Sequence, residues 1–383
     1  MSLLNPIFAL VILVVLLFTA KISDLFFKTK IPEVKYPAID GLRGYLAIFV
    51  FIHHSAIWYY YPKSGLWSAP PSNLFSHFGD SSVVLFFMVT GFLFYTKLIE
   101  AYNKPFDWLR LYVSRFLRIT PLYFLVVMVL LFLVFIVSDF KITESPVLIF
   151  KKIIMWLGFG IIDTPDINNV TNTNYITGGV IWTLKYEWLF YFSLQIVSWL
   201  AFKIKCNWKT ILFSLIGFSF VFYYLKPDGI ILLSFAGGIA AALLNRTEKI
   251  KNFAISFIGS IIALVCLIST IIFFDSPYDY IPLLLLSIFF IIIANGNSLF
   301  GILQLKVSRA LGQISYTIYL VHGLLLYITF NFILKNEYSV TIHWMIISLV
   351  GVALVLVCRI IYELYEGKLL LLTSRLTNKI RGG

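Results

Sequence analysis

The chain alternates between long apolar runs and short polar breaks along almost its whole length. Each apolar run is long enough, or nearly long enough, for a helix to cross roughly 30 Å of hydrocarbon. We therefore expect an all-α fold, a polytopic transmembrane helical bundle of about 10–11 spans. The predicted spans lie near residues 3–20, 41–60, 81–99, 119–138, 182–202, 210–225, 229–244, 253–274, 281–295, 312–334 and 342–366.

Composition agrees with this pattern, since 60% of the residues are hydrophobic and 18% are aromatic. The first run, FALVILVVLLFTA, has no basic region before it and no clear small-residue cleavage site after it. It is therefore predicted to be a span and not a signal peptide. No soluble domain, repeat or low-complexity tract is visible, so we expect the bundle to be the whole protein.

The basic residues are distributed unevenly between the predicted loops. If the N-terminus is outside, the inner segments carry 21 of the 30 Lys and Arg residues and the outer loops carry 6. This asymmetry follows the positive-inside rule, so the net charge of +12 calls for no nucleic-acid partner. Segment 139–181 breaks the pattern: an apolar stretch interrupted by Lys151 and Lys152 predicts an interfacial or re-entrant helix, and a polar external loop follows it.

Several kinds of chemistry lack their motifs in this sequence. The three cysteines, Cys206, Cys266 and Cys358, have no metal-type spacing, so we expect small buried hydrophobic residues and no zinc site. No phosphate-binding glycine loop, HExxH or GxSxG motif occurs. ATP-driven transport, membrane zinc proteolysis and a serine-hydrolase route are therefore disfavoured, and no metal or resident cofactor is expected.

Polar residues inside the second predicted span indicate function. Arg43 and His54 are eleven residues apart, so they share nearly one helix face and lie about 16 Å apart along the axis. With the preceding loop inside, Arg43 is expected at the cytoplasmic mouth and His54 beyond the midplane, whereas His53 points about 100° away. The alternative is that Arg43 snorkels to the interface and that neighbouring helices satisfy the two histidines.

Two other segments carry charges at corresponding depths. Arg115 and Arg118 are three residues apart and are expected at the same cytoplasmic level as Arg43. Three guanidinium groups at one mouth would suit a polyanion such as phosphate, although anchoring by the positive-inside rule explains any one of them. Glu187 lies inside an apolar span, where a carboxylate is either functional or the salt-bridge partner of Lys185.

The span near 312–334 adds a second deep histidine. His322 follows Gly312 by ten residues, which places it about 15 Å from the inner end, close to the expected depth of the histidine in the second span. Ser315, Tyr316 and Tyr319 offer hydroxyl groups nearby, or else pack by hydrogen bonds between helices.

Together these residues form a cationic cytoplasmic mouth and a deeper histidine with a carboxylate. A donor with a phosphate-rich head would dock at the mouth, and its reactive end would extend into the bundle. A histidine near neutral pKa takes a proton from an acceptor hydroxyl, and a carboxylate on its other nitrogen would fix the tautomer. Acyl transfer to a hydroxyl is the chemistry that fits. The competing hypothesis from another class is a transporter or flippase that uses the same polar groups as a relay without covalent chemistry.

Five stretches of the chain, from about residue 37 onward, resemble acyltransferase family 3, the integral membrane O-acyltransferases. They are IDGLRGYLAIFVFIHH, LFFMVTGFLFY, RFLRITPLYFL, WTLKYEWLFYF and GQISYTIYLVHG, in the family's order. The resemblance implies transfer of an acyl group, usually acetyl from acetyl-CoA, to sugars of cell-surface or secreted glycans. It also implies a catalytic histidine at His54, the motif carboxylate at Glu187, the family's arginines at Arg43, Arg115 and Arg118, and a late motif at Tyr316, Tyr319 and His322.

The chain departs from the family pattern at several places. Val84 and Thr90 stand where many members have an acidic residue and a serine, so acceptor preference is expected to differ. The helix at 3–20 is additional, which suggests residues 1–36 as a leading helix with a basic loop and residues 37–383 as the acyltransferase domain. No extracytoplasmic hydrolase-like domain is visible, so the bundle itself would deliver the acyl group.

The expected co-substrate is acetyl-CoA or another acyl-CoA, and the expected setting is a bacterial inner or plasma membrane. The acceptor stays open among exopolysaccharide, O-antigen, peptidoglycan and a lipid-linked sugar, as does the choice between acetyl and a longer acyl group.

Overall fold

The computed structural model describes residues 2–27, 33–102, 104, 106–201, 207–334, 338–373 and 376–377. Within these ranges the regular structure is helical, no strand forms, and one isolated β-bridge joins Ile167 and Val170. The predicted all-α polytopic bundle is thereby confirmed. Cys266 and Cys358 are buried as expected, whereas Cys206 lies outside the described residues.

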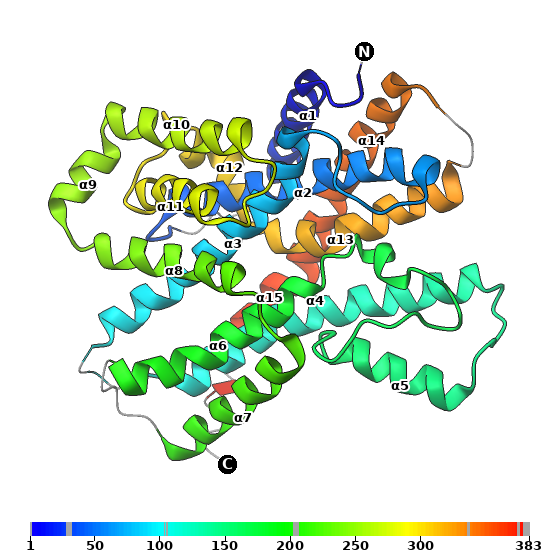
Figure 1. The fold of residues 1–383 in the computed structure, drawn as a ribbon, viewed down its shortest axis with the longest axis horizontal. Helices are drawn as coiled ribbons and strands as arrows, with labels where there is room; N and C mark the ends of the chain where they lie inside the picture. Colours follow the sequence, from blue (N-terminus) through cyan, green and yellow to red (C-terminus); the bar gives the residue numbers. More distant parts are fainter. Residues whose placement is uncertain are drawn as a thin grey trace. The chain divides into compact units, whose positions relative to one another are not determined.

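Figure 1 shows the helices in chain order. They are α1 (Pro6–Phe27), α2 (Pro37–Ser64), α3 (Asn73–Glu100), α4 (Trp108–Val137), α5 (Pro146–Leu157), the 3₁₀ turn η1 (Thr173–Thr177), α6 (Trp182–Ala201), α7 (Trp208–Leu225), α8 (Gly229–Leu244), α9 (Glu248–Ile255), α10 (Phe257–Phe273), α11 (Tyr280–Ala294), the 3₁₀ turn η2 (Ile302–Gln304), α12 (Lys306–Gln313), α13 (Ser315–Ile328), the π-helical η3 (Thr329–Ile333), α14 (Val340–Ile361), the π-helical η4 (Tyr362–Glu366) and α15 (Gly367–Leu371).

Six of the described helical segments are long and apolar enough to cross a membrane, and the bent pair α8 and α9 would make a seventh. The other four predicted spans correspond to α2, α6, α10 and α11. Helices α10 and α11 have 17 and 15 residues, so they are short for a bilayer. Helices α2 and α6 are long enough, but polar residues lower their mean hydropathy. These residues are Arg43, His53 and His54 in α2, and Lys185 and Glu187 in α6.

Two predicted spans have different bounds in the structure. The span near 253–274 is divided at Ser256, whose extended backbone ends α9 and whose hydroxyl accepts the Gly259 N–H at 3.0 Å to cap α10. The span near 312–334 begins at Ser315, because the residues before it form the separate helix α12. In both places a break of one residue, too short to interrupt the hydropathy pattern, separates two helices.

The chain divides into two compact units. The first contains residues 1–96, 228–319 and 328–359, and the second contains residues 97–227, 320–327 and 360–383. In the first unit α10 and α11 run side by side, and α12 packs along the N-terminal half of α2 (Figure 1). Helix α2 is buried around nearly its whole circumference from Ala38 to Trp58. Because this helix faces protein and not lipid, it can contain an arginine and two histidines.

In the second unit α6 and α7 run side by side (Figure 1), and α4 joins them through polar side chains. The Ser214 hydroxyl donates to the side-chain oxygen of Gln195 at 2.7 Å, and Tyr112 lies 2.7 Å from the Ser214 hydroxyl. The Gln195 amide donates to Thr210 at 2.7 Å. These contacts fix the packing of the helix that carries Glu187.

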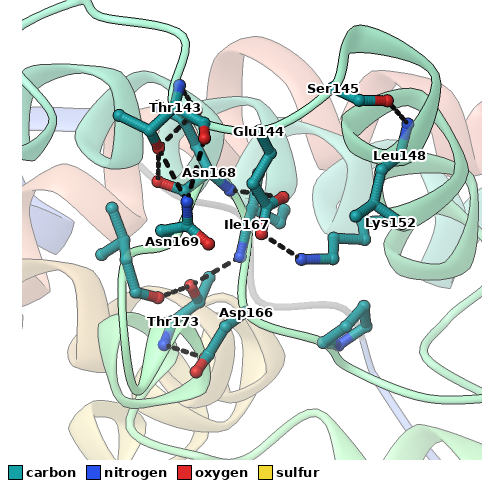
Figure 2. A network of polar contacts seen from close by, with 12 residues as sticks. Thr143, Glu144, Ser145, Leu148, Lys152, Asp166, Ile167, Asn168, Asn169 and Thr173 are labelled. Atoms are coloured by element: carbon teal, nitrogen blue, oxygen red, sulfur yellow. Dashed lines mark hydrogen bonds and ion pairs between the residues drawn. The ribbon is translucent and has the colours of Figure 1, made fainter.

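The segment predicted as an interfacial helix and external loop is built around two asparagine residues (Figure 2). Asn168 is buried and accepts the Thr143 N–H at 2.8 Å, and its amide donates to the Ser138 hydroxyl and the Lys141 carbonyl. The Glu144 carboxylate pairs with Lys152 of α5 at 2.6 Å. This polar loop is therefore held in one conformation by its own side chains.

Helix α5 itself has 12 residues, about 18 Å, so it is too short to cross a bilayer. Its exposed side chains include Val147, Phe150 and Ile154. An interfacial position for α5 stays a prediction.

Candidate functional site

The Asp-Gly-Leu-Arg-Gly motif begins α2 and brings α12 into backbone contact. A Cβ at Gly41 would lie 1.9 Å from the Leu303 carbonyl oxygen, and one at Gly44 would lie 2.7 Å from the Leu311 Cβ. Gly312 approaches α2 equally closely, since a Cβ there would lie 1.9 Å from the Asp40 carbonyl oxygen. Only glycine fits these positions, so the motif fixes the first turns of α2 against α12.

Arg43 is held at this fixed turn. Its side chain is 17% exposed and its guanidinium lies 3.6 Å from the Asp40 carboxylate, one turn earlier on the helix. A separation of this size is an ion pair and not a tight bidentate hydrogen bond. Asp40 therefore places the positive charge of Arg43 near the start of α2.

His54 is 8% exposed and its tautomer is set by its own helix. Its Nδ1 lies 2.9 Å from the Val50 carbonyl oxygen, and because a carbonyl only accepts, Nδ1 carries the proton. In the neutral ring Nε2 is then the basic nitrogen. From the sequence a carboxylate was expected to fix the tautomer of His54. In the structure the Val50 backbone carbonyl fixes it instead.

His53 points elsewhere, as predicted from the helix geometry. Its Nδ1 donates to the Phe75 carbonyl at 2.7 Å, and its ring packs on Gly79 of α3, where a Cβ would lie 2.6 Å from ring atoms. The His53 ring also meets the His54 ring edge-on, with centroids 5.0 Å apart. His53 is thus part of the contact between α2 and α3, so its role in the first unit is packing.

An aromatic cluster that was not predicted from the sequence lies beside His54. After α2 ends at Ser64, Gly65 caps it in the left-handed region at φ 70°, and the chain turns back so that the ring centroids of Trp67 and His54 lie 6.3 Å apart. Trp58 and Tyr61 each contact Trp67 edge-on at 5.4 Å. The half-buried indole of Trp67 therefore forms an aromatic wall beside the candidate base.

A fourth histidine supports the same turn of α2. The ring of His343, in α14, donates from Nε2 to the carbonyl of Ser55 at 3.1 Å and stacks on Phe330 at 5.5 Å. His343 is fully buried. It therefore ties α14 to the residue that directly follows His54.

The late motif is shared between the two units. In the first unit Ser315 donates to the Gly312 carbonyl at 2.8 Å, Tyr319 packs edge-on against Phe86 at 5.8 Å, and Tyr316 is half-buried. These contacts place Ser315 and Tyr319 in helix packing.

In the second unit His322 is fully buried. A Cβ at the neighbouring Gly323 would lie 2.2 Å from the Thr177 backbone carbon. The loop that contains η1 is therefore in backbone contact with the chain next to His322.

Four basic side chains cluster in the second unit, where the sequence analysis considered only Arg115 and Arg118. Lys97 interacts electrostatically with Arg110, Arg115 and Arg118, and Glu100 is the acidic neighbour of this lysine. Like charges repel, so a cluster of this kind is stabilised by an anion with several charges. Lys97 and Arg110 are thus additional candidates for binding phosphate groups.

Glu187 interacts with Arg115 and not with Lys185. The Tyr191 hydroxyl donates to the Glu187 carboxylate at 2.8 Å, and Arg115 hydrogen-bonds to Tyr191. The acidic neighbour of Lys185 is Asp163. These contacts argue against the alternative that Glu187 serves only to neutralise Lys185.

Nothing in the described residues forms a metal centre, since no group of three or more His, Cys, Asp or Glu side chains has suitable geometry there. The polar groups on α2, α4 and α6 are instead histidines, guanidinium groups and a carboxylate. A family model described as an acyltransferase domain matches residues 36–363.

The chain belongs to acyltransferase family 3. No curated protein and no solved structure matched it.

In this acyltransferase the helix before the matched region is part of the first unit. Asp24 of α1 pairs with Lys306 of α12 at 3.3 Å, and the indole of Trp344 donates to the Leu3 carbonyl at 3.0 Å. Helix α1 therefore packs on α12 and α14 although it precedes residue 36.

Proposed function

We propose that this acyltransferase moves an acyl group, in the simplest case acetyl, from cytoplasmic acyl-CoA to a hydroxyl group of a cell-surface or secreted glycan. The observation that carries the proposal is the tautomer of His54, whose Nδ1–H is held by the Val50 carbonyl at 2.9 Å so that Nε2 is the base. A multi-pass protein of the bacterial plasma membrane is the proposed setting.

The proposed reaction is a direct transfer. His54 Nε2 removes the proton from the acceptor hydroxyl while the oxygen attacks the thioester carbonyl carbon. The tetrahedral intermediate then breaks its carbon–sulfur bond, and the sulfur leaves with the proton that the imidazolium returns. The products are an acyl ester and free CoA, so no acyl group has to rest on the protein.

The donor is proposed to bind through its phosphate groups. Arg43, Arg115 and Arg118 are the proposed donor-binding residues, and Lys97 and Arg110 add charge beside Arg115 and Arg118. Glu187 is proposed as a further catalytic residue, with a role other than setting the His54 tautomer, which the Val50 carbonyl sets.

A glycan acceptor is supported by the aromatic wall beside His54. The apolar faces of sugar rings stack on aromatic side chains, and binding sites for small molecules combine aromatic walls with a few placed polar groups. Trp67 meets this requirement at 6.3 Å from the His54 ring. The indole would hold a sugar whose hydroxyl is presented to the base.

Mass spectrometry of surface glycan from cells that express the wild type or His54→Gln tests the proposal. The wild type is expected to add base-labile acyl esters whose label comes from isotope-labelled acyl-CoA, and His54→Gln is expected to add none. Unchanged glycan in wild-type cells, together with movement of an unmodified substrate across the membrane, would favour the transporter hypothesis instead.

A further inference from the structure

Tyr191 lies between two charged residues of the second unit. It is one helical turn after Glu187 on α6, and its hydroxyl donates to the Glu187 carboxylate at 2.8 Å. Arg115 of α4 forms a hydrogen bond with the same hydroxyl. A phenol has one proton, which the carboxylate accepts here, so the guanidinium donates to the phenol oxygen. The three side chains form a continuous chain from guanidinium to phenol to carboxylate.

The middle residue of this chain of hydrogen bonds is shielded from solvent, and Arg115 and Glu187 are half-buried. Tyr191 is 3% exposed, and its ring contacts Trp188 edge-on at 6.0 Å and Phe190 at 6.2 Å. Hydrogen bonds to charged groups are stronger where water is excluded, and neighbouring bonds in a chain polarise one another. The position of the Glu187 carboxylate therefore depends on the Tyr191 hydroxyl, which in turn depends on Arg115.

We propose that Tyr191 is a positioning residue that couples the donor-binding guanidinium of Arg115 to the Glu187 carboxylate. The inference rests on the proposed function, in which Arg115 binds donor phosphate and Glu187 takes part in transfer. A phosphate that binds Arg115 fixes the guanidinium, the guanidinium fixes the phenol, and the phenol fixes the carboxylate. Donor binding then also fixes the position of the Glu187 carboxylate.

Tyr191→Phe removes the hydroxyl and keeps the ring. With purified protein and labelled acyl-CoA, we expect kcat at saturating donor to fall about tenfold or more, because the lost bond is one to a charged group. KM for the acceptor is expected to stay near its wild-type value. In combination with Arg115→Lys, the loss is expected to be smaller than the product of the two separate losses, because both changes break the same chain.

Tyr112→Phe is the matched control. The Tyr112 hydroxyl belongs to the same helix interface and lies 2.7 Å from the Ser214 hydroxyl, and it meets Tyr191 only at the backbone carbonyl, at 3.4 Å. This variant is expected to lower thermal stability while kcat per folded enzyme stays unchanged. If Tyr191→Phe behaves like Tyr112→Phe, with stability reduced and kcat intact, then Tyr191 is only a packing residue and the inference is overturned.

The two proposals fail in different ways. Activity that is lost in His54→Gln but normal in Tyr191→Phe would overturn only the role of Tyr191. If the double variant of Arg115→Lys and Tyr191→Phe loses kcat by the full product of the two separate losses, only the coupling is overturned. Transfer that persists in His54→Gln would instead overturn the proposed reaction.

Discussion

Replacement of Asn168 by alanine is the sharpest test of how the polar loop between α5 and α6 is held. The Asn168 side chain accepts from the Thr143 N–H at 2.8 Å and the Thr143 hydroxyl at 3.1 Å, and donates to Ser138 at 2.8 Å and Lys141 at 2.7 Å. The adjacent Asn169 is exposed and makes two longer contacts, at 3.1 and 3.3 Å to Thr143. Asn169→Ala is therefore a matched control.

The two asparagines share their backbone strain. Asn168 has φ 54° and Asn169 has φ 59°, so the cost of placing alanine in the left-handed region is nearly equal and cancels in the comparison. Each net hydrogen bond contributes about 1 kcal/mol, and water restores part of what is lost. We expect Asn168→Ala to destabilise the loop by about 2 to 3 kcal/mol more than Asn169→Ala.

Hydrogen exchange measured by mass spectrometry on the protein in lipid nanodiscs reports this difference. The amide of Ile167 donates to the Thr173 hydroxyl and the amide of Thr173 donates to the Asp166 carboxylate, so neither bonds to a mutated side chain (Figure 2). The free-energy difference corresponds to roughly 30- to 150-fold faster exchange of these two amides in Asn168→Ala than in Asn169→Ala. Equal exchange rates in the two variants would refute the reasoning.

Four further predictions concern other parts of the structure. The hydrogen bond from Lys152 is the main reason that the pKa of Glu144 is lowered. The charged carboxylate therefore stabilises the loop at pH values above the ordinary Glu pKa, and this stabilisation is lost as the pH falls through the lowered pKa of Glu144. The protection of the loop amides, taken relative to their intrinsic exchange rates at each pH, should therefore fall in acid in the wild type but show no such pH dependence in Glu144→Gln. Arg43→Lys should raise KM for acyl-CoA about tenfold because a point charge does not replace a bidentate fork, and an unchanged KM would contradict the donor clamp. Trp67→Ala should raise KM for the acceptor at least about tenfold and Trp67→Phe should raise it less, while KM for the donor stays constant in both variants. Equal changes in donor KM in the two variants would contradict the sugar-stacking role. Gly323→Ala should abolish folded protein, measured as detergent-stable monodisperse yield, because the added carbon would meet the Thr177 backbone at 2.2 Å.

The helices were predictable from hydropathy, because a span needs an unbroken apolar run and the chain shows these runs clearly. The breaks at Ser256 and Ile314 were missed, since one residue with non-helical geometry changes the average hydropathy very little. A signal for the first break does exist in the sequence. Ser256 followed by an apolar run is a typical helix N-cap, and it caps α10 in the structure.

The functional residues on single helices were easier to predict than their partners. The different directions of His53 and His54 follow from 100° per residue, and the structure places their rings on different neighbours. Tyr191 lies four residues after Glu187, which is visible in the sequence, but its bond to Arg115 depends on how α4 packs on α6. Trp67 approaches His54 only because the loop after Gly65 turns back, and no hydropathy pattern encodes that turn.

The most direct test of the account is the rate of acyl transfer by purified His54→Gln and His53→Gln, measured with labelled acetyl-CoA and a glycan acceptor. Both variants lose an imidazole of similar burial whose Nδ1–H is held by a backbone carbonyl, but the His53 ring packs on Gly79 of α3 whereas the His54 ring lies beside Trp67. The account predicts that His54→Gln loses transfer by at least about a hundredfold, whereas His53→Gln keeps its kcat and loses only thermal stability. Transfer at the wild-type rate by folded His54→Gln would contradict it.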